Sequence, residues 1–117
     1  LKNPLNRFKA NIRTRICNSF KYGFTKKSKS TEILGCPISE FRQYIESKWE
    51  SWMNWDNYGN WDGYPTKINN SWDLDHIIPV SSAKTEEELT KLNHHTNFQP
   101  LCSYTNRSIK IAKPSLN

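Results

Sequence analysis

The spacing of apolar residues predicts two amphipathic helices in the N-terminal half of the chain. In the first, which covers about residues 4–22, apolar side chains recur at three- and four-residue steps, and Gly23 supplies a stop signal. The second begins near Pro37, which suits a first helical turn, and runs to about Trp52. The polar segment Lys26–Ser30 separates them as a loop. The apolar positions are Leu5, Phe8, Ile12, Ile16 and Phe20 in the first helix, and Ile38, Phe41, Ile45, Trp49 and Trp52 in the second.

In the C-terminal part of the chain the pattern is strand, helix, strand, helix. We expect a strand over Ser71–Val80 and a second strand over residues 97–101. Between them, Thr85 opens a short acidic helix that ends near Leu92, in a sequence that fits a capping box. A last helix covers residues 103–112. The fold class is therefore α+β, with a hairpin and helix (ββα) preceded by N-terminal helices.

Alternation along the first strand divides its polar residues between two faces. Asp73 and Asp75 fall on one face, whereas Trp72, Leu74 and His76 fall on the other. A regular strand would therefore direct Asp75 and His76 to opposite sides. If both serve one site, we expect a bulge or a strand end near His76.

An aromatic, glycine-containing segment precedes the first strand at residues 55–64. Its Gly and Asn residues disfavour regular structure, while Trp55, Tyr58 and Trp61 favour burial. Two interpretations remain open: a loop packed over a small core, and a surface on which nucleic acid bases stack.

Positive charge is concentrated at the N-terminus. The formal net charge is +6, and residues 1–31 hold none of the 11 acidic residues. Such a block is typical of a segment that binds a polyanion, although a solvated helix in a basic protein would look the same. The predicted DNA contacts are Arg7, Lys9, Arg13, Arg15, Lys21, Lys26, Lys27 and Lys29, joined by Arg107 and Lys110 of the last helix.

Length and composition favour one small domain in a reducing compartment. With 117 residues and 35% hydrophobic residues, the core must depend on large aromatic side chains. Cys17, Cys36 and Cys102 are widely spaced, so a disulfide framework is not expected. No apolar run approaches a membrane span and no signal peptide is visible, so we expect an intracellular protein without a membrane partner, in a bacterium or a virus-infected cell.

Three polar residues in the C-terminal part have chemistry suited to phosphodiester hydrolysis. Asp75 offers a carboxylate oxygen, Asn106 an amide oxygen and His76 a neutral imidazole. A hard cation such as Mg²⁺ takes one or two protein oxygens and leaves the other positions to water and phosphate. A histidine beside it can accept a proton from water near neutral pH.

These residues stand in a pattern that resembles the HNH endonucleases of the ββα-metal (His-Me finger) superfamily. The pattern consists of Asp75–Pro79, Asn97–Cys102 and Asn106 followed by Lys110, and it extends upstream through Leu34–Cys36 and Trp55–Gly59. It covers most of the chain, with the Asp-His pair and the two later asparagines as its most specific part. The final position is Asn106 where many members have histidine, which makes this an HNN variant.

The resemblance implies roles for individual residues. His76 would be the general base, Asp75 and Asn106 would hold Mg²⁺, Mn²⁺ or another divalent cation, and Asn97 would brace the loop that orients His76. Asp73, His94 and His95 are further candidates, for contacts just outside the metal or to a phosphate. The alternatives that remain open are a surface charge at Asp73 and ordinary polar surface at the two histidines. Many relatives bind a structural zinc through Cys-x-x-Cys pairs, but Cys102 is followed three residues later by Thr105, so no structural zinc is expected.

The predicted protein is a single HNH nuclease domain over residues 1–117. Residues 1–31 form a basic helix and arm, 32–64 a helix and aromatic loop, and 71–112 the ββα-metal motif. We expect a DNA endonuclease, monomeric or dimeric, that nicks one strand per site. The alternatives are a catalytically silent DNA-binding module and a nuclease domain that serves a larger assembly.

Overall fold

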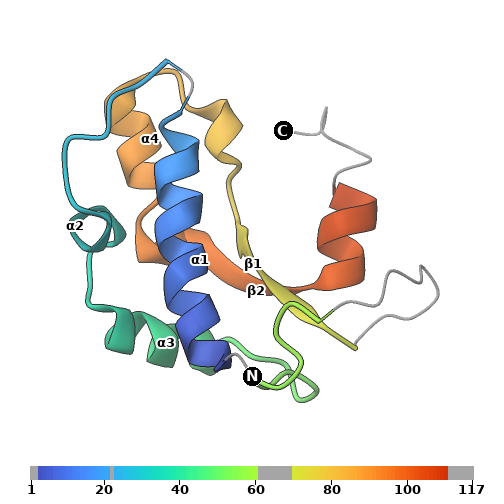
Figure 1. Ribbon diagram of the computed structural model, residues 1–117. Helices are drawn as coiled ribbons and strands as arrows, with labels where there is room; N and C mark the ends of the chain where they lie inside the picture. Colours follow the sequence, from blue (N-terminus) through green and yellow to red (C-terminus); the bar gives the residue numbers. More distant parts are fainter. Residues whose placement is uncertain (1–2, 22, 61–69, 111–117) are drawn as a thin grey trace.

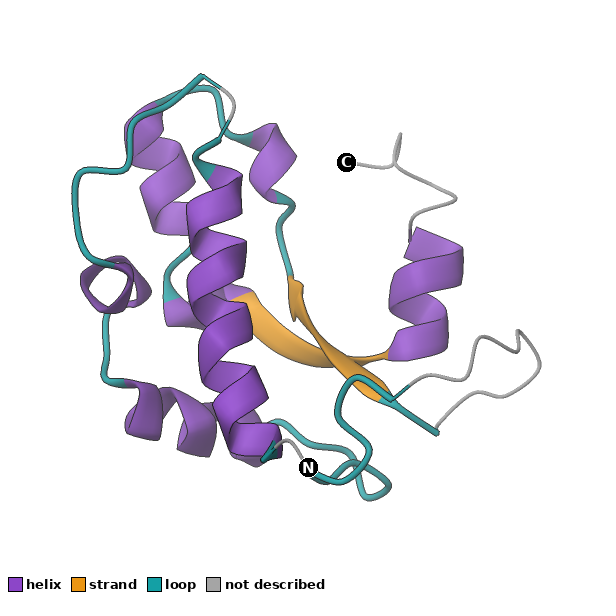
Figure 2. Ribbon diagram, in the orientation of Figure 1, coloured by secondary structure: helices purple, strands orange, loops and turns teal. Residues whose placement is uncertain are grey.

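A two-stranded antiparallel sheet separates a group of helices from a single C-terminal helix (Figure 1, Figure 2). The computed structural model describes residues 3–21, 23–60 and 70–110, without the side chains of 108–110. This mixed architecture agrees with the predicted α+β class. Among the described residues, no helix has the length and apolar character needed to cross a membrane.

Helix α1 (Pro4–Ser19) forms where the apolar spacing predicted a helix. Asn3 caps its N-terminus by accepting a hydrogen bond from the backbone N–H of Leu5 at 2.8 Å, and Pro4 occupies the first turn. The predicted stripe is buried, with Phe8, Ile12 and Ile16 at 0% exposure. The helix ends at Ser19 rather than near residue 22, and Phe20 packs into the core just beyond it.

The second predicted helix is shorter than expected and is preceded by an unpredicted one. Helix α2 (Ser30–Leu34) has Gly35 as its C-terminal cap, and α3 (Ile38–Ser47) begins after Pro37. Phe41 and Ile45 of α3 are buried as the stripe indicated. Trp49 lies beyond the end of α3, so it reaches the core from a loop and not from a helical face.

Strands β1 (Trp72–His76) and β2 (Phe98–Cys102) pair residue for residue. Leu74 lies opposite Pro100, and His76 lies opposite Phe98 at the end of the ladder. The predicted first strand is thus shorter than residues 71–80, and Val80–Ser82 forms the 3₁₀ turn η1 instead. The pairing of β1 with β2 contains no bulge. Of the two features expected near His76, a bulge or a strand end, the structure therefore has the strand end.

Helix α4 (Glu86–Leu92) begins at the predicted cap. The Thr85 hydroxyl accepts a hydrogen bond from the backbone N–H of Glu88 at 3.0 Å. The Glu88 carboxylate accepts from the N–H of Lys84 at 2.7 Å rather than from Thr85, so only half of the capping box forms. The 3₁₀ turn η2 (His95–Asn97) leads into β2, and the π-helix η3 (Thr105–Lys110) follows it.

Aromatic rings join the N-terminal helices to the sheet. Phe8 of α1 stacks on Phe41 of α3, with ring centroids 5.5 Å apart. In the aromatic segment, Tyr58 is 3% exposed and lies against Trp72 at 4.6 Å. Tyr58 therefore belongs to the core, as the packing interpretation of this segment requires, while Trp61 and Tyr64 lie outside the described residues.

At Gly35, a larger residue would have both an unfavourable backbone angle and a steric clash with His94. Its φ is +88°, and a Cβ atom built on it would lie 2.5 Å from Nε2 of His94. We predict that Gly35→Ala destabilises the protein by more than the about 1–2 kcal/mol expected for a left-handed backbone alone. Denaturant unfolding measures this loss.

Gly23→Ala is the matched control for that measurement. Gly23 has a similar φ of +96°, but nothing lies within 4 Å of its Cβ position. Equal losses of unfolding free energy in the two variants would contradict the predicted clash with His94.

Candidate functional site

His76 lies at the end of β1, partly exposed, and its ring is tied to a buried amide. Its Nε2 is 2.9 Å from Oδ1 of Asn93, a residue with no exposed surface in the turn after α4. The Nδ2 group of Asn93 donates to Oγ of Ser19 at 2.8 Å and to the Leu89 carbonyl at 3.2 Å. Ser19 in turn donates to the carbonyl of Ile16 at 2.7 Å.

This chain of hydrogen bonds selects one tautomer of His76. The two acceptors around Nδ2 of Asn93 orient the amide so that its oxygen faces the imidazole. An amide oxygen can only accept a hydrogen bond, so Nε2 of His76 must carry the proton. In the neutral ring, the basic lone pair then lies on Nδ1.

Asn97 holds the loop that follows His76. Its Oδ1 accepts from the N–H of Ile78, and its Nδ2 donates to the Ile78 carbonyl, both at 2.9 Å. Nδ2 also donates to the Leu92 carbonyl at 2.7 Å, and the Asn97 carbonyl accepts from the N–H of Ile77 at 2.8 Å. The backbone leaving β1 is therefore fixed to η2, and through Asn97 to α4, immediately after His76.

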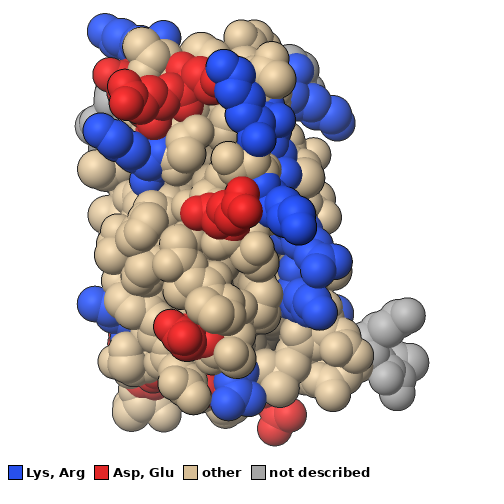
Figure 3. Space-filling view, turned by 90° about the vertical axis from the view of Figure 1, so that its left-hand side faces the viewer, with Lys and Arg blue, Asp and Glu red and all other residues tan. Residues whose placement is uncertain are grey.

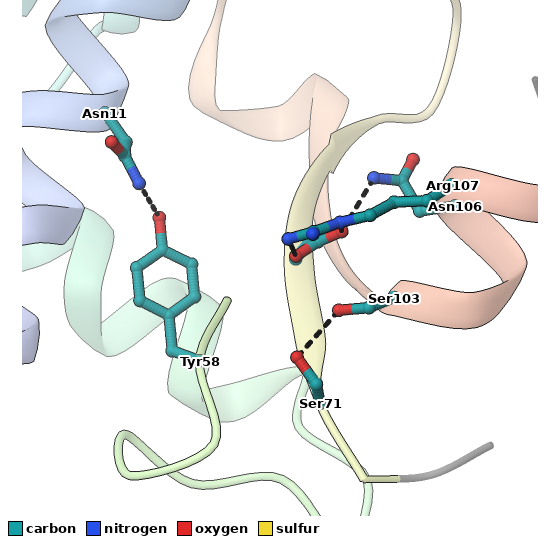
Figure 4. Close-up of polar contacts among 7 residues, drawn as sticks. Asn11, Tyr58, Ser71, Ser103, Asn106 and Arg107 are labelled. Atoms are coloured by element: carbon teal, nitrogen blue, oxygen red, sulfur yellow. Dashed lines mark hydrogen bonds and ion pairs between the residues drawn. The ribbon is translucent and has the colours of Figure 1, made fainter. Parts of the chain in front are cut away.

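The carboxylates of β1 lie on the other face of the strand. Asp75 is 7% exposed, and its Oδ2 accepts from Nε2 of Gln99 at 3.0 Å across the ladder. Asp73 is 5% exposed and faces η3, where Arg107 reaches both of its oxygens at 2.8 Å (Figure 4). Nδ2 of Asn106 also donates to Asp73, at 3.1 Å.

The sequence predicts that Asn106 and Asp75 hold one metal ion together, and the structure adds a hydrogen bond from Asn106 to Asp73. Asn106 shares the η3-facing side of β1 with Asp75, but the carboxylate it contacts is Asp73. Asp73 is a buried partner of η3 and not a surface charge. Arg107, which is also a predicted DNA contact, forms an ion pair with Asp73, and its side chain is 40% exposed.

The Asp73 environment favours the ionised carboxylate. Burial raises its pKa, but hydrogen bonds from Arg107 and Asn106, together with the Arg107 charge, outweigh burial and bring the pKa below its ordinary value of 3.8. The same contacts raise the pKa of Arg107. Asp73 therefore remains charged at neutral pH and anchors η3 to β1.

The donor set on this face fits a hard cation better than a soft one. Asp75 supplies carboxylate oxygens, and the hydrogen bond from Nδ2 to Asp73 engages the nitrogen of the Asn106 amide, so the amide oxygen is the atom of Asn106 that could contact a cation. The described residues contain no cluster of three or more His, Cys, Asp or Glu side chains that could hold a metal ion. Hard cations such as Mg²⁺ often take one or two protein oxygens and complete their coordination with water or phosphate.

The predicted DNA-contacting residues fall into two groups. Lys9, Arg13, Lys21 and Lys29 are exposed, and a column of Lys and Arg side chains runs along one edge of the face in Figure 3. The others have protein partners: Arg7 donates to the Tyr58 carbonyl at 3.0 Å, Lys26 to the Ser28 carbonyl at 2.8 Å, and Lys27 pairs with Glu86 at 3.1 Å. Arg15 lines the same pocket as His76, and the side chain of Lys110 is outside the described part.

Arg7 and its neighbour Asn11 connect α1 to the aromatic segment. The guanidinium of Arg7 lies 5.2 Å from the centre of the Tyr58 ring, and Nδ2 of Asn11 donates to the Tyr58 hydroxyl at 2.8 Å (Figure 4). Burial raises the pKa of Tyr58 despite these contacts. Arg7 therefore has a structural role in addition to any contact with a polyanion.

His94 and His95 face the N-terminal helices. Nδ1 of His95 donates to the Leu34 carbonyl at 3.0 Å, and His94 packs on His95 with ring centroids 4.2 Å apart. Burial, and secondarily the neighbouring His95, lower the pKa of His94. Within the described residues, these contacts place the pair against α2 rather than beside His76 or Asp75.

Most of this chain is similar to a protein of a giant virus. The chain is 35% identical over 100 residues to "Uncharacterized protein L426" of Acanthamoeba polyphaga mimivirus. The match covers 81% of this chain but 38% of the viral protein, so the chain spans well under half of that relative's length. No family model matches the chain. No solved structure matches it at a significant level.

The ion pair of Asp73 predicts a specific dependence of stability on pH. A lowered pKa means that folding stabilises the ionised form of the Asp73 carboxylate. This stabilisation is complete above the ordinary pKa of 3.8 and is lost as the pH falls through the lower pKa of the folded state. We predict that Asp73→Asn costs about 1–3 kcal/mol of unfolding free energy at neutral pH. The difference from wild type should shrink near about pH 2, as measured by urea unfolding.

Asp56→Asn serves as control because Asp56 is an exposed carboxylate. It should change stability little at either pH. An Asp73→Asn deficit that is unchanged in acid would show that the loss comes from altered packing and not from the charge.

Proposed function

We propose that this protein is a divalent-metal-dependent endonuclease of the HNH type that hydrolyses DNA phosphodiester bonds. The observation that carries the proposal is the hydrogen bond between His76 and Asn93, which directs the proton to Nε2 and the lone pair to Nδ1. A general base needs such a lone pair and a fixed ring orientation. The motif containing Asp75, His76, Asn97 and Asn106 supports the same assignment through its resemblance to HNH enzymes.

In this proposal, His76 accepts the proton of the attacking water at Nδ1. Asn93 keeps the ring in place during that transfer, since Nε2 can donate to its oxygen in both the neutral and the protonated state. Asn97 fixes the backbone after His76, which limits movement of the ring relative to β1. Both asparagines are positioning residues, because each acts through His76 or its loop.

Asp75 and Asn106 are the residues that would hold the metal ion. When bound, a divalent cation would offset the negative charge that develops on the phosphate during hydrolysis. Asp73 supports this side of the site by fixing Asn106 and Arg107 of η3 in place.

DNA would be attracted by the basic residues of α1 and the following arm. Helix α1 contains no acidic residue, and Lys9 and Arg13 on it are exposed. Such contacts bind phosphates without reading the base sequence. One motif per chain means one scissile phosphate, so a monomer would nick a single strand.

A catalytically silent DNA-binding module is the second candidate. It is favoured by the contact of Asn106 with Asp73, because that amide is engaged within the protein and not with Asp75. The basic face of α1 is common to both functions, so catalysis must be tested separately from binding.

We predict that His76→Ala lowers the rate of plasmid nicking by about 10²–10⁴-fold, the usual cost of losing a general base. Affinity for DNA should change little, because the substitution removes no cation. Gel analysis of supercoiled plasmid with Mg²⁺, Mn²⁺ or EDTA measures the rate and its metal dependence.

His94→Ala is the matched histidine control, since His94 packs against His95 and Gly35. It should retain the wild-type nicking rate. A His76→Ala variant as active as wild type would exclude His76 as the base, and wild-type protein that binds DNA but leaves it intact with every metal would favour the silent module.

We also predict that Asp75→Asn raises the Mg²⁺ concentration needed for half-maximal nicking by at least about tenfold, since even residues that only orient metal ligands contribute that much. The rate at saturating metal should fall less than in His76→Ala. Asp56→Asn controls for the loss of one negative charge. An unchanged Mg²⁺ dependence in Asp75→Asn would remove Asp75 from the metal site.

A further inference from the structure

A pocket of about 560 Å³ opens beside His76, on the face of β1 opposite the carboxylates. It lies between the C-terminal half of α1, the turn η1 and helix α4. Besides His76, its lining includes Arg15, Phe24, Val80, Ser81 and Ala83. The pocket is thus continuous with the proposed general base but separate from the proposed metal ligands.

Arg15 gives this pocket a positive charge that no carboxylate of the described residues pairs with. Its side chain is half-buried on α1. The ion pairs found among the described residues involve Lys27, Arg42 and Arg107, and no described carboxylate pairs with Arg15. A partly desolvated guanidinium favours an anion with several acceptor oxygens, and phosphate fits this requirement.

The rest of the wall suits a flat, partly apolar group. Phe24, Val80 and Ala83 are partly buried and pack on the core, so they present apolar surface at fixed positions. Ser81 adds a hydroxyl at the rim. The volume is in the range of pockets that hold small molecules, large enough for one nucleotide and too small for a base pair still stacked in a duplex.

We propose that this pocket binds an unpaired deoxynucleotide next to the scissile phosphate. Arg15 holds the phosphate of that nucleotide, and its base lies against the wall formed by Phe24, Val80 and Ala83. This inference rests on the proposed function for its position along the strand, although binding to the pocket requires no cleavage.

The pocket defines a substrate class. A base inside a duplex must leave its stack before it can enter, which costs free energy, and the cost is smallest for a mismatched, damaged or single-stranded base. Single-stranded DNA, or a duplex with an unpaired nucleotide, should therefore be the preferred substrate.

Two matched pairs of variants test the pocket through binding alone. In the first, Arg15→Ala is compared with Arg13→Ala, which removes the same charge from an exposed position on α1 that is not part of this pocket. In the second, Ala83→Phe fills the pocket, and Ala10→Phe places the same side chain on an exposed position of α1. Thermal unfolding of each variant checks that the fold is retained.

The probe is a fluorescein-labelled single-stranded oligodeoxynucleotide, titrated in EDTA and followed by fluorescence anisotropy. We expect Arg15→Ala and Ala83→Phe each to raise Kd by about tenfold, within the range of base stacking contributions. Arg13→Ala and Ala10→Phe should raise it by less than about threefold, as for a single surface phosphate contact. If each variant matches its control, the pocket is not a nucleotide site.

A second measurement separates this proposal from the proposed function. Nicking with Mg²⁺ is compared for a perfect duplex and for the same duplex with one unpaired nucleotide. Faster cleavage of the second substrate, lost in Ala83→Phe, supports the pocket. Equal cleavage rates for the two substrates would overturn the proposed nucleotide site but not the proposed nuclease activity. Binding that depends on the pocket, without cleavage of either substrate, would overturn the nuclease activity but not the nucleotide site.

Discussion

The amides of Asn93 and Asn97 connect the end of β1 to helices α1 and α4. Asn93 joins His76 to Ser19 of α1 and to Leu89 of α4, and Asn97 joins the Ile78 backbone to Leu92. Both side chains are buried, so an unmade hydrogen bond on either would cost more than the bond itself contributes. This penalty restricts the loop and the histidine ring to the arrangement in which all partners are satisfied.

Because β1 pairs regularly with β2, the candidate site residues of β1 are divided between the two faces of the strand. Since the register has no bulge, Asp73 and Asp75 face η3 while His76 faces α1 and α4. The ladder ends at His76, opposite Phe98. The proposed metal ligands and the proposed base would thus approach a phosphate from opposite sides of a strand terminus, with the pocket that contains Arg15 on the base side.

Features with a local cause were predictable from the sequence. The apolar stripe predicted α1, and Thr85 with its nearby glutamates predicted α4, because each signal lies within the element it describes. The hairpin also followed from two short apolar runs. Residues Asp75, His76 and Asn97 were singled out by their motif, and the structure adds the contacts that each makes.

Features with long-range causes were missed. Helix α2 is short and ends at Gly35, where His94 packs from a distant part of the chain. The pairing of Asp73 with Arg107 joins residues 34 positions apart, and Asn93 acts on His76 through a tertiary contact with no sequence spacing to indicate it. The stripe of α3 was extended too far because Trp49 packs against the core from a loop, which periodicity alone cannot distinguish from a helical position.

We infer that Asn93 holds His76 with its proton on Nε2 and its lone pair on Nδ1. Long-range ¹H–¹⁵N NMR spectra of ¹⁵N-labelled protein, recorded at a pH where the ring is neutral, report directly which nitrogen carries the proton. We predict that His76 is protonated at Nε2 alone in the wild-type protein and that both tautomers of His76 are populated in Asn93→Ala. A wild-type ring protonated at Nδ1, or a tautomer mixture that Asn93→Ala leaves unchanged, would contradict it.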